Sequence, residues 1–564
     1  MSKYNWQIKK RIFSDPVKQI LFNRQLIDQN EHLNPEVFLE PDFDRDLCNS
    51  KLLPDYKKFD KRIILALKRK EKIGIYADYD ADGIPGAAFL SKALSKIGLE
   101  NEIYIPSRDE GYGLNKTGID YLINRGCSLI ITVDLGIKEH KNAEYIYKKK
   151  CDLIITDHHI PDDSLPRAIA VVNPKISGSK YKFNELSGAG VVFKLIYGLK
   201  NQFPDRLTEH FLKWNLDLIA ISTISDVVPL IGENRVIAKF GLISLQKTKN
   251  LGLKKLYQVI SIDPKKINEY TIGFQIGPRI NAPGRLGEAI KPFKLLTTNN
   301  DEEAIELAKE LNNQNGIRQE AMDQVFVEAS LEIEREKLNR NKIIILASKW
   351  PRGVIGPAAS RLSEKFLRPI IVFSKEGDTF HGSARSIKGF DIVEALRMSE
   401  KLLVAYGGHK GAAGVEISSE NFSKFHQAML KIASRKITKS MLEPKIEIDL
   451  IIDSTEINLK LFHQIEKLQP FGMGNPRPVL LIENVQISEQ KIVGRDGKHL
   501  KFIFNRQKDI FEGIFFGFFE KGYKLDKEKK YDVVFRPEVN YFNGNEKVSL
   551  NIIDIKENGS KKEE

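Results

Sequence analysis

The stretch KIGIYADYDADG (residues 72–83) decides the fold that we predict for this chain. Its first six residues are mostly apolar, which is typical of a strand buried on both faces of a parallel sheet. This strand leads directly into Asp78, Asp80 and Asp82. The sequence therefore predicts a buried strand whose carboxyl end carries a group of acids.

Three further segments have the same strand-like character. They are SLIITV (128–133), DLIIT (152–156) and AIAVV (168–172). Helical patterns lie between the strands, such as PGAAFLSKALSKIG (85–98), which begins with a proline in its first turn and ends at Gly98. Alternating strands and helices are typical of an open α/β sheet, in which ligands bind beyond the carboxyl ends of the strands.

The rest of the chain predicts three further regions. Residues 300–340 are highly charged and carry apolar residues at helical spacing, so we expect one or two long helices there. KIIILAS (342–348) and PIIVFS (369–374) predict strands of a second α/β domain, and short strands after Pro444 predict a small β-barrel. The expected division is an N-terminal segment (1–60), a first α/β domain (61–300), a connecting helical segment (301–340), a second α/β domain (341–440), a barrel (445–556) and a tail (557–564).

Composition limits the class of protein. Of 564 residues, 41% are hydrophobic, which supports a sizeable core and excludes a disordered or fibrous chain. No stretch approaches the roughly 18 apolar residues of a membrane-spanning helix, and the start lacks the apolar core of a signal peptide. We therefore expect a cytoplasmic protein with no membrane partner. Cys48, Cys127 and Cys151 have no CxxC spacing, which argues against a disulfide framework or a thiolate zinc site.

The net charge of +13 fits a polyanionic partner such as nucleic acid. A solvated basic surface explains the same charge equally well, so charge alone leaves the partner open. The barrel region adds basic and aromatic residues together, a combination that suits single-stranded DNA because any base can stack on an aromatic ring. These residues are Lys491, Arg495, Lys498, Lys501, Phe502, Phe504, Arg506 and Tyr541, and we expect half or more of the aromatic ones to be barrel core.

Acidic and imidazole groups follow several of the predicted strands. Asp134 follows the strand at 128–133, and Asp157, His158 and His159 follow the strand at 152–156. An apolar helix, WNLDLIAISTIS (214–225), then delivers Asp226. A single aspartate after a strand is usually a turn or a helix cap. Four such elements at successive ends instead predict one shared site.

Crowded carboxylates repel one another, and burying them without compensation is costly, so the cluster favours bound cations. Its ligands exceed what one ion needs, which favours two divalent ions sharing a carboxylate. Oxygen and imidazole ligands together favour Mn²⁺ over Mg²⁺, although availability leaves Mg²⁺ as the alternative. A calcium loop of the EF-hand type is excluded, because it requires Glu where the chain has Phe89.

These motifs resemble a known family. DYDADG (78–83), VDLG (133–136), TDHH (156–159) and SDVVPL (225–230), in this order, resemble the DHH phosphoesterase superfamily. GPRINAPGR (277–285), GSARS (382–386) and GGHKGAAG (407–414) resemble further motifs of its RecJ branch, the single-strand-specific 5′→3′ DNA exonucleases. The resemblance covers about residues 70–560. It implies a parallel-sheet DHH domain, long connecting helices, a second α/β domain of the DHHA1 type and a C-terminal OB-like barrel that binds nucleic acid.

The resemblance also implies roles for individual residues. The implied metal ligands are Asp80, Asp82, Asp134, His158 and Asp226, with Asp134 as the bridge. His159 would contact the scissile phosphate and stabilise the transition state, while Asp78 and Asp157 would orient the ligands. One departure is Tyr76, which stands where many relatives have a histidine ligand. Either water completes the shell of that metal, or its affinity is lower.

The implied substrate contacts are Arg108, Arg279, Asn281, Ser383, Arg385 and His409. Arg279 and the Ser383/Arg385 pair would hold the 5′-phosphate, because a guanidinium presents a fork of donors to phosphate oxygens. Each motif also has a structural interpretation. GPRINAPGR is then a turn-rich loop, GSARS a strand end, and GGHKGAAG a tight turn between a helix and a strand.

Taken together, the sequence predicts a two-metal, single-strand-specific 5′→3′ exodeoxyribonuclease that releases 5′-mononucleotides in DNA repair and recombination. Its partner is single-stranded DNA, and a helicase and a single-strand-binding protein that supply this substrate are candidate partners. Two alternatives remain open. One is a DHH phosphoesterase for dinucleotides or nanoRNA, and the other is a DNA-binding relative that has lost its metals.

Overall fold

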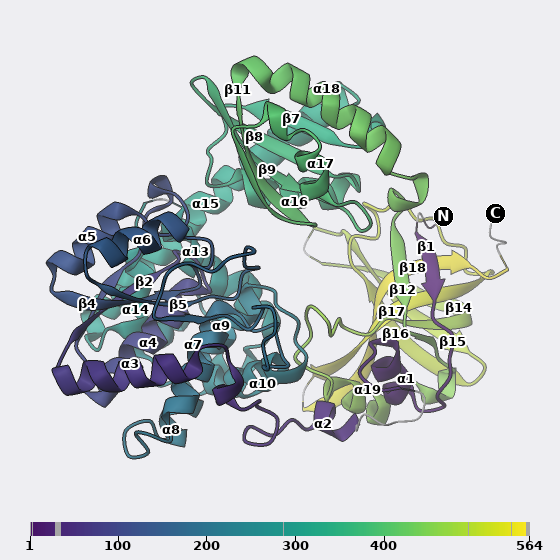
Figure 1. Ribbon diagram of the computed structural model, residues 1–564. Coiled ribbons are helices and arrows are strands. Elements are labelled where there is room, and N and C mark those ends of the chain that lie inside the picture. Colours follow the sequence, from purple (N-terminus) through teal and green to yellow (C-terminus); the bar gives the residue numbers. More distant parts are fainter. Residues whose placement is uncertain are drawn as a thin grey trace. The chain divides into compact units, whose positions relative to one another are not determined.

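The protein combines α/β domains with a β-barrel, which confirms the predicted fold class (Figure 1). A computed structural model describes residues 2, 4–28, 35–285, 287–494, 496–542 and 544–559, without the side chains of residues 109, 541 and 542. The chain forms two compact units. One unit combines Met1–Leu311 with Ile446–Glu564, and the other is Asn312–Lys445.

Five parallel strands form the first sheet, in the order β3-β2-β4-β5-β6. Their bounds are β2 (Lys72–Ala77), β3 (Asn101–Tyr104), β4 (Cys127–Val133), β5 (Asp152–Thr156) and β6 (Ala170–Val172). The four predicted strands are thus confirmed. The additional strand, β3, is half-buried at the sheet edge, so it lacks the apolar run by which the others are recognised.

Helices cover both faces of this sheet and enclose two apolar cores. Ile73 and Ile75 of β2 face one core, and Tyr76 faces the other. The first core is covered by α3 (Tyr56–Arg69), α4 (Gly83–Ile97), α7 (Gly188–Leu199) and α9 (Leu216–Ser225), and the second by α5 (Lys116–Asn124) and α6 (His140–Lys148). Further helices of this domain are α8 (Glu209–Trp214), α10 (Gly232–Gln246), α11 (Leu251–Val259), α12 (Glu269–Thr271), α13 (Gly277–Gly284) and α14 (Ile290–Thr297).

The GPRINAPGR motif is helical, so its interpretation as a turn-rich loop is wrong. A π-helical turn at Ile272–Ile276 leads into α13, and Pro278 occupies the first turn. Proline is tolerated there because the amide of that position needs no partner within the helix. The glycines and prolines that suggest a loop instead allow close packing, since Gly284 lies directly against the Tyr79 carbonyl oxygen.

The second unit contains a five-stranded sheet in the order β10-β11-β9-β8-β7. Its strands are β7 (Ile344–Ser348), β8 (Ile370–Glu376), β9 (Thr379–Arg385), β10 (Ala405–His409) and β11 (Ala412–Ser418), and its helices are α16 (Ile355–Phe366), α17 (Ile392–Arg397) and α18 (Ser419–Lys436). The two predicted strands, β7 and β8, are confirmed. The GGHKGAAG turn joins β10 to β11, so the helix expected before it is wrong. α15 (Asp301–Arg335) is one continuous helix of 35 residues.

The predicted barrel is confirmed. Its strands are β13 (Leu450–Ile451), β14 (Leu480–Val493), β15 (His499–Arg506), β16 (Asp509–Phe515), β17 (Lys530–Phe542) and β18 (Asn545–Glu557). Pairing of β14 with β17 closes it. Phe502 and Phe504 are barrel core, as expected. Arg495 and the Tyr541 side chain lie outside the described residues, as do residues 560–564 of the tail.

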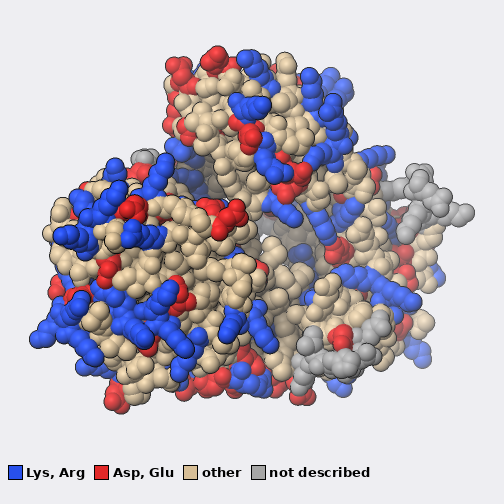
Figure 2. Space-filling view, in the orientation of Figure 1, with Lys and Arg blue, Asp and Glu red and all other residues tan. Residues whose placement is uncertain are grey.

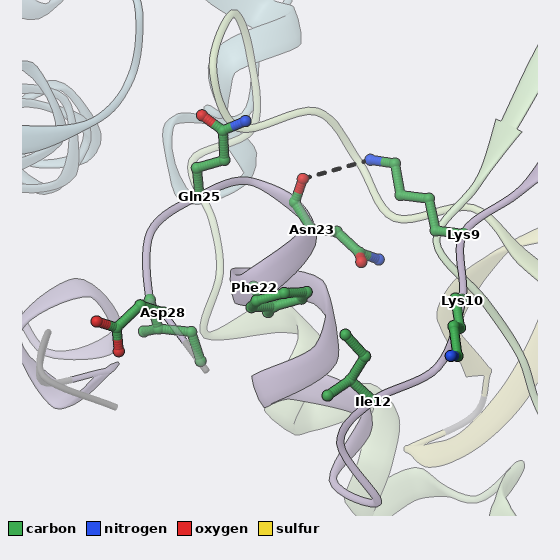
Figure 3. A pocket seen from close by; sticks show the side chains of 8 residues that line it. Lys9, Lys10, Ile12, Phe22, Asn23, Gln25 and Asp28 are labelled. Atoms are coloured by element: carbon green, nitrogen blue, oxygen red, sulfur yellow. Dashed lines mark hydrogen bonds between the residues drawn. The ribbon is translucent and has the colours of Figure 1, made fainter. Parts of the chain in front are cut away.

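The N-terminal segment, whose sequence carries no readable motif, packs on the barrel. β1 (Asn5–Ile8) pairs with β12 (Lys445–Ile448), and α1 (Pro16–Asn23) inserts Ile20 and Leu21 into the barrel core. Beside α1 lies a pocket of about 640 Å³. Figure 3 shows that Phe22 is one of the residues lining this pocket and that the Lys9 side chain reaches toward the Asn23 carbonyl oxygen. The segment also includes α2 (Pro35–Leu39).

None of the helices that the structure describes has both the length and the apolar character needed to cross a bilayer. Charged residues are instead spread over the surface. In Figure 2, Lys and Arg gather at the lower left, over the region of α3. The exposed basic residues of that helix are Lys57, Lys58, Lys61, Lys68 and Arg69.

Candidate metal centre

Three neighbouring strands bring the predicted ligands together. β2, β4 and β5 are adjacent and parallel, so the residues that follow them meet at one edge of the sheet. His158 Nε2 lies 3.1 Å from Asp134 Oδ1 and 3.5 Å from Asp82 Oδ2. It lies 3.7 Å from Oδ2 of Asp226, which caps the end of α9. The shared site that the sequence predicts therefore exists.

The side chains form three overlapping groups whose ligand-type atoms lie within 4.8 Å of one another. The groups are Asp134, His158 and His159; Asp82, His158 and Asp226; and Asp78, Asp80 and Asp134. Asp134 and His158 each belong to two groups, and of the two only Asp134 has a pair of carboxylate oxygens with which to bridge two cations. The sequence interpretation gives Asp78 only an orienting role, whereas the structure adds its carboxylate to a ligand group.

The tautomer of His158 exposes a ligand nitrogen. His158 Nδ1 lies 3.0 Å from the Leu186 carbonyl oxygen, which can only accept, so Nδ1 carries the proton. Burial lowers the pKa of His158, which keeps the ring neutral. Nε2 therefore presents a lone pair toward Asp134 Oδ1, which lies 3.1 Å away, and no proton joins the two atoms when the Asp134 carboxyl is ionised. Two lone pairs at this distance fit a bound cation, which would accept both.

The carboxylates are unfavourable without a cation. Burial, followed by the charges of neighbouring aspartates, raises the pKa of Asp78, Asp134 and Asp226 well above the ordinary value. The same causes raise the pKa of Asp80. Asp78 Oδ1 is buried and accepts no hydrogen bond from the residues that the structure describes. Divalent cations would satisfy these oxygens and offset their repulsion, so the residues present fit a two-metal site.

The start of α7 holds one of these ligands in place. Asp82 accepts hydrogen bonds from the Gly188 amide (2.7 Å), the Ala189 amide (2.8 Å) and Ser222 Oγ (2.6 Å). Carboxylates are favoured at helix N-termini because the first amides have no partner within the helix. Gly188 also packs against Asp134, so close that a Cβ there would lie 2.5 Å from the Asp134 Cβ. Sequence reasoning missed this element, although SGAG (187–190) opens a helix with two glycines.

Asp157 orients His159 and does not join a ligand group. Its Oδ1 accepts from the His158 amide (2.7 Å) and the His159 amide (3.0 Å) and lies 2.8 Å from His159 Nδ1. Burial acts to raise the pKa of Asp157, but the hydrogen bonds and positive charge of His159 lower it overall. Burial likewise acts against protonation of His159, but Asp157 raises its pKa overall. Asp157 therefore favours the protonated form of His159, whose side chain is 32% exposed at the open side of the cluster.

We expect Asp157→Asn to reduce the turnover rate about 10–100-fold, the usual range for partners that orient active groups. The amide cannot stabilise protonated His159 or fix its ring. Mn²⁺ stoichiometry should stay unchanged, because Asp157 belongs to none of the three ligand groups. Steady-state rates and Mn²⁺ titration of the purified variant check this. Asp163→Asn, at an exposed position of the same loop, is the control, and unchanged turnover in Asp157→Asn would contradict the orienting role.

Tyr76 does not point toward the carboxylates. Its hydroxyl donates to the Gly113 carbonyl oxygen (3.2 Å) and accepts from the Asn115 amide (3.2 Å), and its ring is fully buried. It thus anchors the loop that carries Tyr112. The Tyr112 hydroxyl in turn lies 3.5 Å from His159 Nδ1, and its ring is 56% exposed. Tyr112 therefore lies beside the cluster with a face open to a ligand.

Two of the predicted substrate contacts lie on α13. Asn281 Oδ1 accepts from the Ala81 amide (2.7 Å), so Asn281 holds the loop of metal ligands. Arg279 donates to the Gln275 carbonyl oxygen (2.6 Å), one turn earlier. The third contact, Arg108, lies in a short helical turn, Arg108–Glu110. Its charge acts on Tyr79, whose pKa is raised by burial and then by Asp78, and is lowered in part by Arg108 and Arg285. Arg285, which was not singled out in the sequence, therefore lies near the same tyrosine.

The other predicted substrate contacts lie in the second unit, which is described by itself. Arg385 donates to Ser383 Oγ (3.0 Å) and to Ser360 Oγ (2.9 Å). The pair faces Gly356 in the first turn of α16, where a Cβ would lie 3.2 Å from each of them. His409 and Arg385 both pair with Ala412, so they stand in one row across β10, β11 and β9. Ser383 and Arg385 thus lie on β9 and His409 on β10, on either side of β11.

Lys175 is a further residue that sequence reasoning missed. Its positive charge lowers the pKa of Asp226 and of His158, so it lies close to both. The only signal is its place in the NPK stretch that follows β6. In that stretch Asn173 Nδ2 donates to the His159 carbonyl oxygen (2.8 Å), which ties this loop to the cluster.

Comparison with known proteins assigns three regions to families. Residues 72–223 match the DHH family, N-terminal domain, residues 340–435 the DHHA1 domain, and residues 448–554 the RecJ OB domain. Two relatives are the single-stranded-DNA-specific exonucleases RecJ of Bacillus subtilis and Salmonella typhimurium. The first is 37% identical over 496 residues, covering 87% of this chain and 62% of the relative. The second is 31% identical over 513 residues, covering 87% of this chain and 88% of the relative. The chain therefore spans less than two thirds of the Bacillus protein.

Solved structures give a similar result. The crystal structure of RecJ from Thermus thermophilus in complex with Mn²⁺ matches with a TM-score of 0.82 and 26% identity, over 98% of this chain and 80% of that chain. The structure of that protein with Mg²⁺ matches with a TM-score of 0.75 and 26% identity, over 98% and 78%.

Proposed function

The chain belongs to the RecJ family, and on that premise we propose that it is a single-stranded-DNA-specific 5′→3′ exonuclease that releases 5′-mononucleotides by metal-dependent hydrolysis. The observation that carries this proposal is the cluster of three overlapping ligand groups, which are linked through Asp134 and His158. Its carboxylates and the bare His158 Nε2 suit two divalent cations. Mn²⁺ and Mg²⁺ are the two ions named for similar RecJ structures.

The proposed ligands of the two cations are Asp78, Asp80, Asp82, Asp134, His158 and Asp226, with Asp134 shared between them. Bound there, the cations would supply charge neutralisation at the phosphate and a lowered pKa for a coordinated water. His159 would contact the scissile phosphate, because it lies at the open side of the cluster and Asp157 favours its protonated form. Its positive charge would then stabilise the charge that develops on the phosphate oxygens.

The second unit supplies the proposed site for the 5′-phosphate. Arg385 is held by Ser383 and Ser360, and His409 stands in the same row of the sheet. A guanidinium with neighbouring hydroxyls and an imidazole is a set of donors suited to a terminal phosphate. Arg279 of the first unit is also proposed to hold the 5′-phosphate, and Arg108 to contact the strand. Asn281 would act by holding the Ala81 amide.

Single-stranded DNA is the proposed partner of the barrel. Phe516 and Phe519 are about half-exposed at the end of β16, and Lys498 lies nearby through its ion pair with Glu520. Exposed rings beside lysines suit a strand without sequence preference. We place the enzyme in the cytoplasm, in repair and recombination. A helicase and a single-strand-binding protein would supply its substrate.

Product analysis tests this function. One 5′-labelled and one 3′-labelled single-stranded oligomer are each incubated with Mn²⁺, Mg²⁺ or chelator. We expect immediate release of labelled mononucleotide from the 5′ label, a shortening ladder from the 3′ label and no reaction with duplex or chelator. Hydrolysis of dinucleotides alone would instead identify a small-substrate phosphoesterase. Metal-independent binding without hydrolysis would identify a non-catalytic relative.

A further inference from the structure

The loop that carries the proposed metal ligand Asp226 forms a backbone hydrogen bond with the barrel region. The Asp226 amide donates to the Ser222 carbonyl oxygen (2.9 Å), so the loop begins as the last turn of α9. Val227 then adopts φ +59°, which is rare for a β-branched residue. Four residues after Asp226, the Leu230 amide donates to the Met473 carbonyl oxygen (2.7 Å). The loop therefore bonds to a segment that lies some 240 positions later in the chain.

We name residues 468–476 the barrel clamp. The clamp is a closed turn, because Gly472 and Asn475 exchange two backbone hydrogen bonds (2.8 and 3.1 Å). Asn475 is fully buried, and its Nδ2 donates to the Leu468 (2.7 Å) and Pro470 (2.8 Å) carbonyl oxygens. Every one of these bonds lies within the clamp. It is thus a preformed element against which the Asp226 loop packs.

Two glycines of the clamp allow the loop to approach. A Cβ at Gly474 would lie 3.2 Å from Pro229 Cβ, and one at Gly472 would lie 2.8 Å from Leu230 Cδ1. Gly474 also has φ +72°, which favours glycine. A Cβ at 3.2 Å is closer than ordinary van der Waals contact, so the ring of Pro229, which cannot rotate away, has to shift by a few tenths of an ångström. The position of Pro229, three residues after Asp226, therefore depends on the clamp.

Arg235 forms a second contact between this part of the first α/β domain and the barrel clamp. It lies on α10, just after the loop, and its side chain is 1% exposed. Its guanidinium donates to the carbonyl oxygens of Phe38 (2.6 Å), Leu468 (2.8 Å), Lys467 (3.0 Å) and Gln469 (3.0 Å). The last three form the end of α19 (Leu459–Glu466) and the start of the clamp, where carbonyl groups have no helical partner. A fully bonded, buried guanidinium fixes the clamp to α10.

From these contacts we propose that the barrel clamp is a positioning element of the metal centre. It sets the place of the Asp226 carboxylate through Leu230 and Pro229. The proposal rests on the proposed role of Asp226 as a metal ligand. The proposal predicts different effects on the two cations. With Asp134 shared, the cation held by Asp82, His158 and Asp226 depends on the barrel region, whereas the cation held by Asp78, Asp80 and Asp134 has no ligand on the Asp226 loop.

Gly474→Ala tests the proposal, with Gly522→Ala as the matched control. Both glycines have φ +72°, so alanine costs the same backbone strain at each, but a Cβ at Gly522 would meet nothing within 4 Å. We expect Gly474→Ala to weaken one of two Mn²⁺ sites about tenfold and leave the other unchanged, at the lower end of effects for groups that orient a ligand. Gly522→Ala should bind both ions as the parent does. Mn²⁺ titration followed by calorimetry and by electron paramagnetic resonance counts the two sites.

Thermal unfolding of the metal-free variants separates positioning from loss of fold. If Gly474→Ala unfolds, Gly472→Ala replaces it, because Gly472 carries no positive φ and meets only the tip of Leu230. Two intact Mn²⁺ sites in a folded clamp variant would overturn the proposal. An Asp226→Asn variant that keeps both Mn²⁺ sites would instead overturn the ligand role of Asp226. Failure of the clamp proposal and failure of the proposed ligand role are therefore distinguishable.

Discussion

Replacing Asp134 by Asn should abolish hydrolysis while making the metal-free protein harder to unfold. Asp134 has ligand-type atoms near Asp78 and Asp80 and also near His158. Because Asp134 is the proposed shared ligand, its loss affects both cations. We expect the turnover rate to fall about 10³-fold or more, since metal ions supply several kcal/mol of transition-state stabilisation. The fold should survive, because the amide has nearly the same shape.

The stability gain has an electrostatic cause. Burial and neighbouring aspartates raise the pKa of Asp134 in the folded state. A raised pKa stabilises the fold at low pH, and this contribution is lost as the pH rises above about 4, the ordinary value in unfolded chains. At neutral pH the metal-free parent therefore bears the cost of burying this acidic group among other aspartates, and the Asn variant does not. The unfolding temperature of metal-free Asp134→Asn should therefore fall less steeply with rising pH than the unfolding temperature of the metal-free parent.

Activity on a labelled single strand and thermal unfolding in chelator, each across a pH series, measure both effects. Asp217→Asn is the control, because Asp217 is also buried, on the same helix that ends at Asp226, but accepts from Thr248 (2.6 Å) outside the cluster. That variant should keep its turnover. An active Asp134→Asn enzyme, or one less stable than the parent without metal, would contradict the bridging role.

Gly188→Ala should come close to the same loss of activity without changing a ligand. A Cβ at Gly188 would lie 2.5 Å from Asp134 Cβ and 2.7 Å from Asp134 Oδ1. The Gly188 amide also donates to Asp82. The added methyl group must therefore displace two ligands, one in each part of the cluster. We expect at least about 100-fold lower turnover, since misplacement by about 1 Å costs this much.

Gly190→Ala provides the comparison on the same helix. A Cβ there would lie 3.2 Å from Ser187 Oγ and 3.5 Å from its next neighbours, which is tolerable. Alanine should even stabilise α7, by about 0.5–1 kcal/mol relative to glycine. Turnover and Mn²⁺ affinity of the two variants are measured side by side. Equal activity of Gly188→Ala and Gly190→Ala would show that the α7 approach does not shape the site.

The sequence predicts this site well because the fold itself creates it. β2, β4 and β5 are recognisable as apolar runs, and parallel strands place their following residues at one edge. Asp134 and His158 could therefore be brought together from the sequence. β3 could not be recognised, since an edge strand needs no apolar run.

Contacts between distant segments were not predictable. Asp78 reads as an orienting residue, and only the geometry adds its carboxylate to a ligand group. The glycines of SGAG and of the barrel clamp have no local signature, because their partners, Asp134 and Pro229, come from other parts of the chain. Arg235 looks like a surface residue of a helix until its four acceptors are known.

The packing of the N-terminal segment on the barrel has a consequence for how the chain is made. Residues 5–8 pair with a strand that the ribosome adds more than 430 positions later, and Ile20 needs barrel side chains that follow it. The first α/β domain has its own core and can close early. During synthesis, residues 5–8 and Ile20 therefore stay without these partners until the barrel residues have been added. Since pairings between distant segments form slowly, we expect the pairing of β1 with β12 to form late in folding.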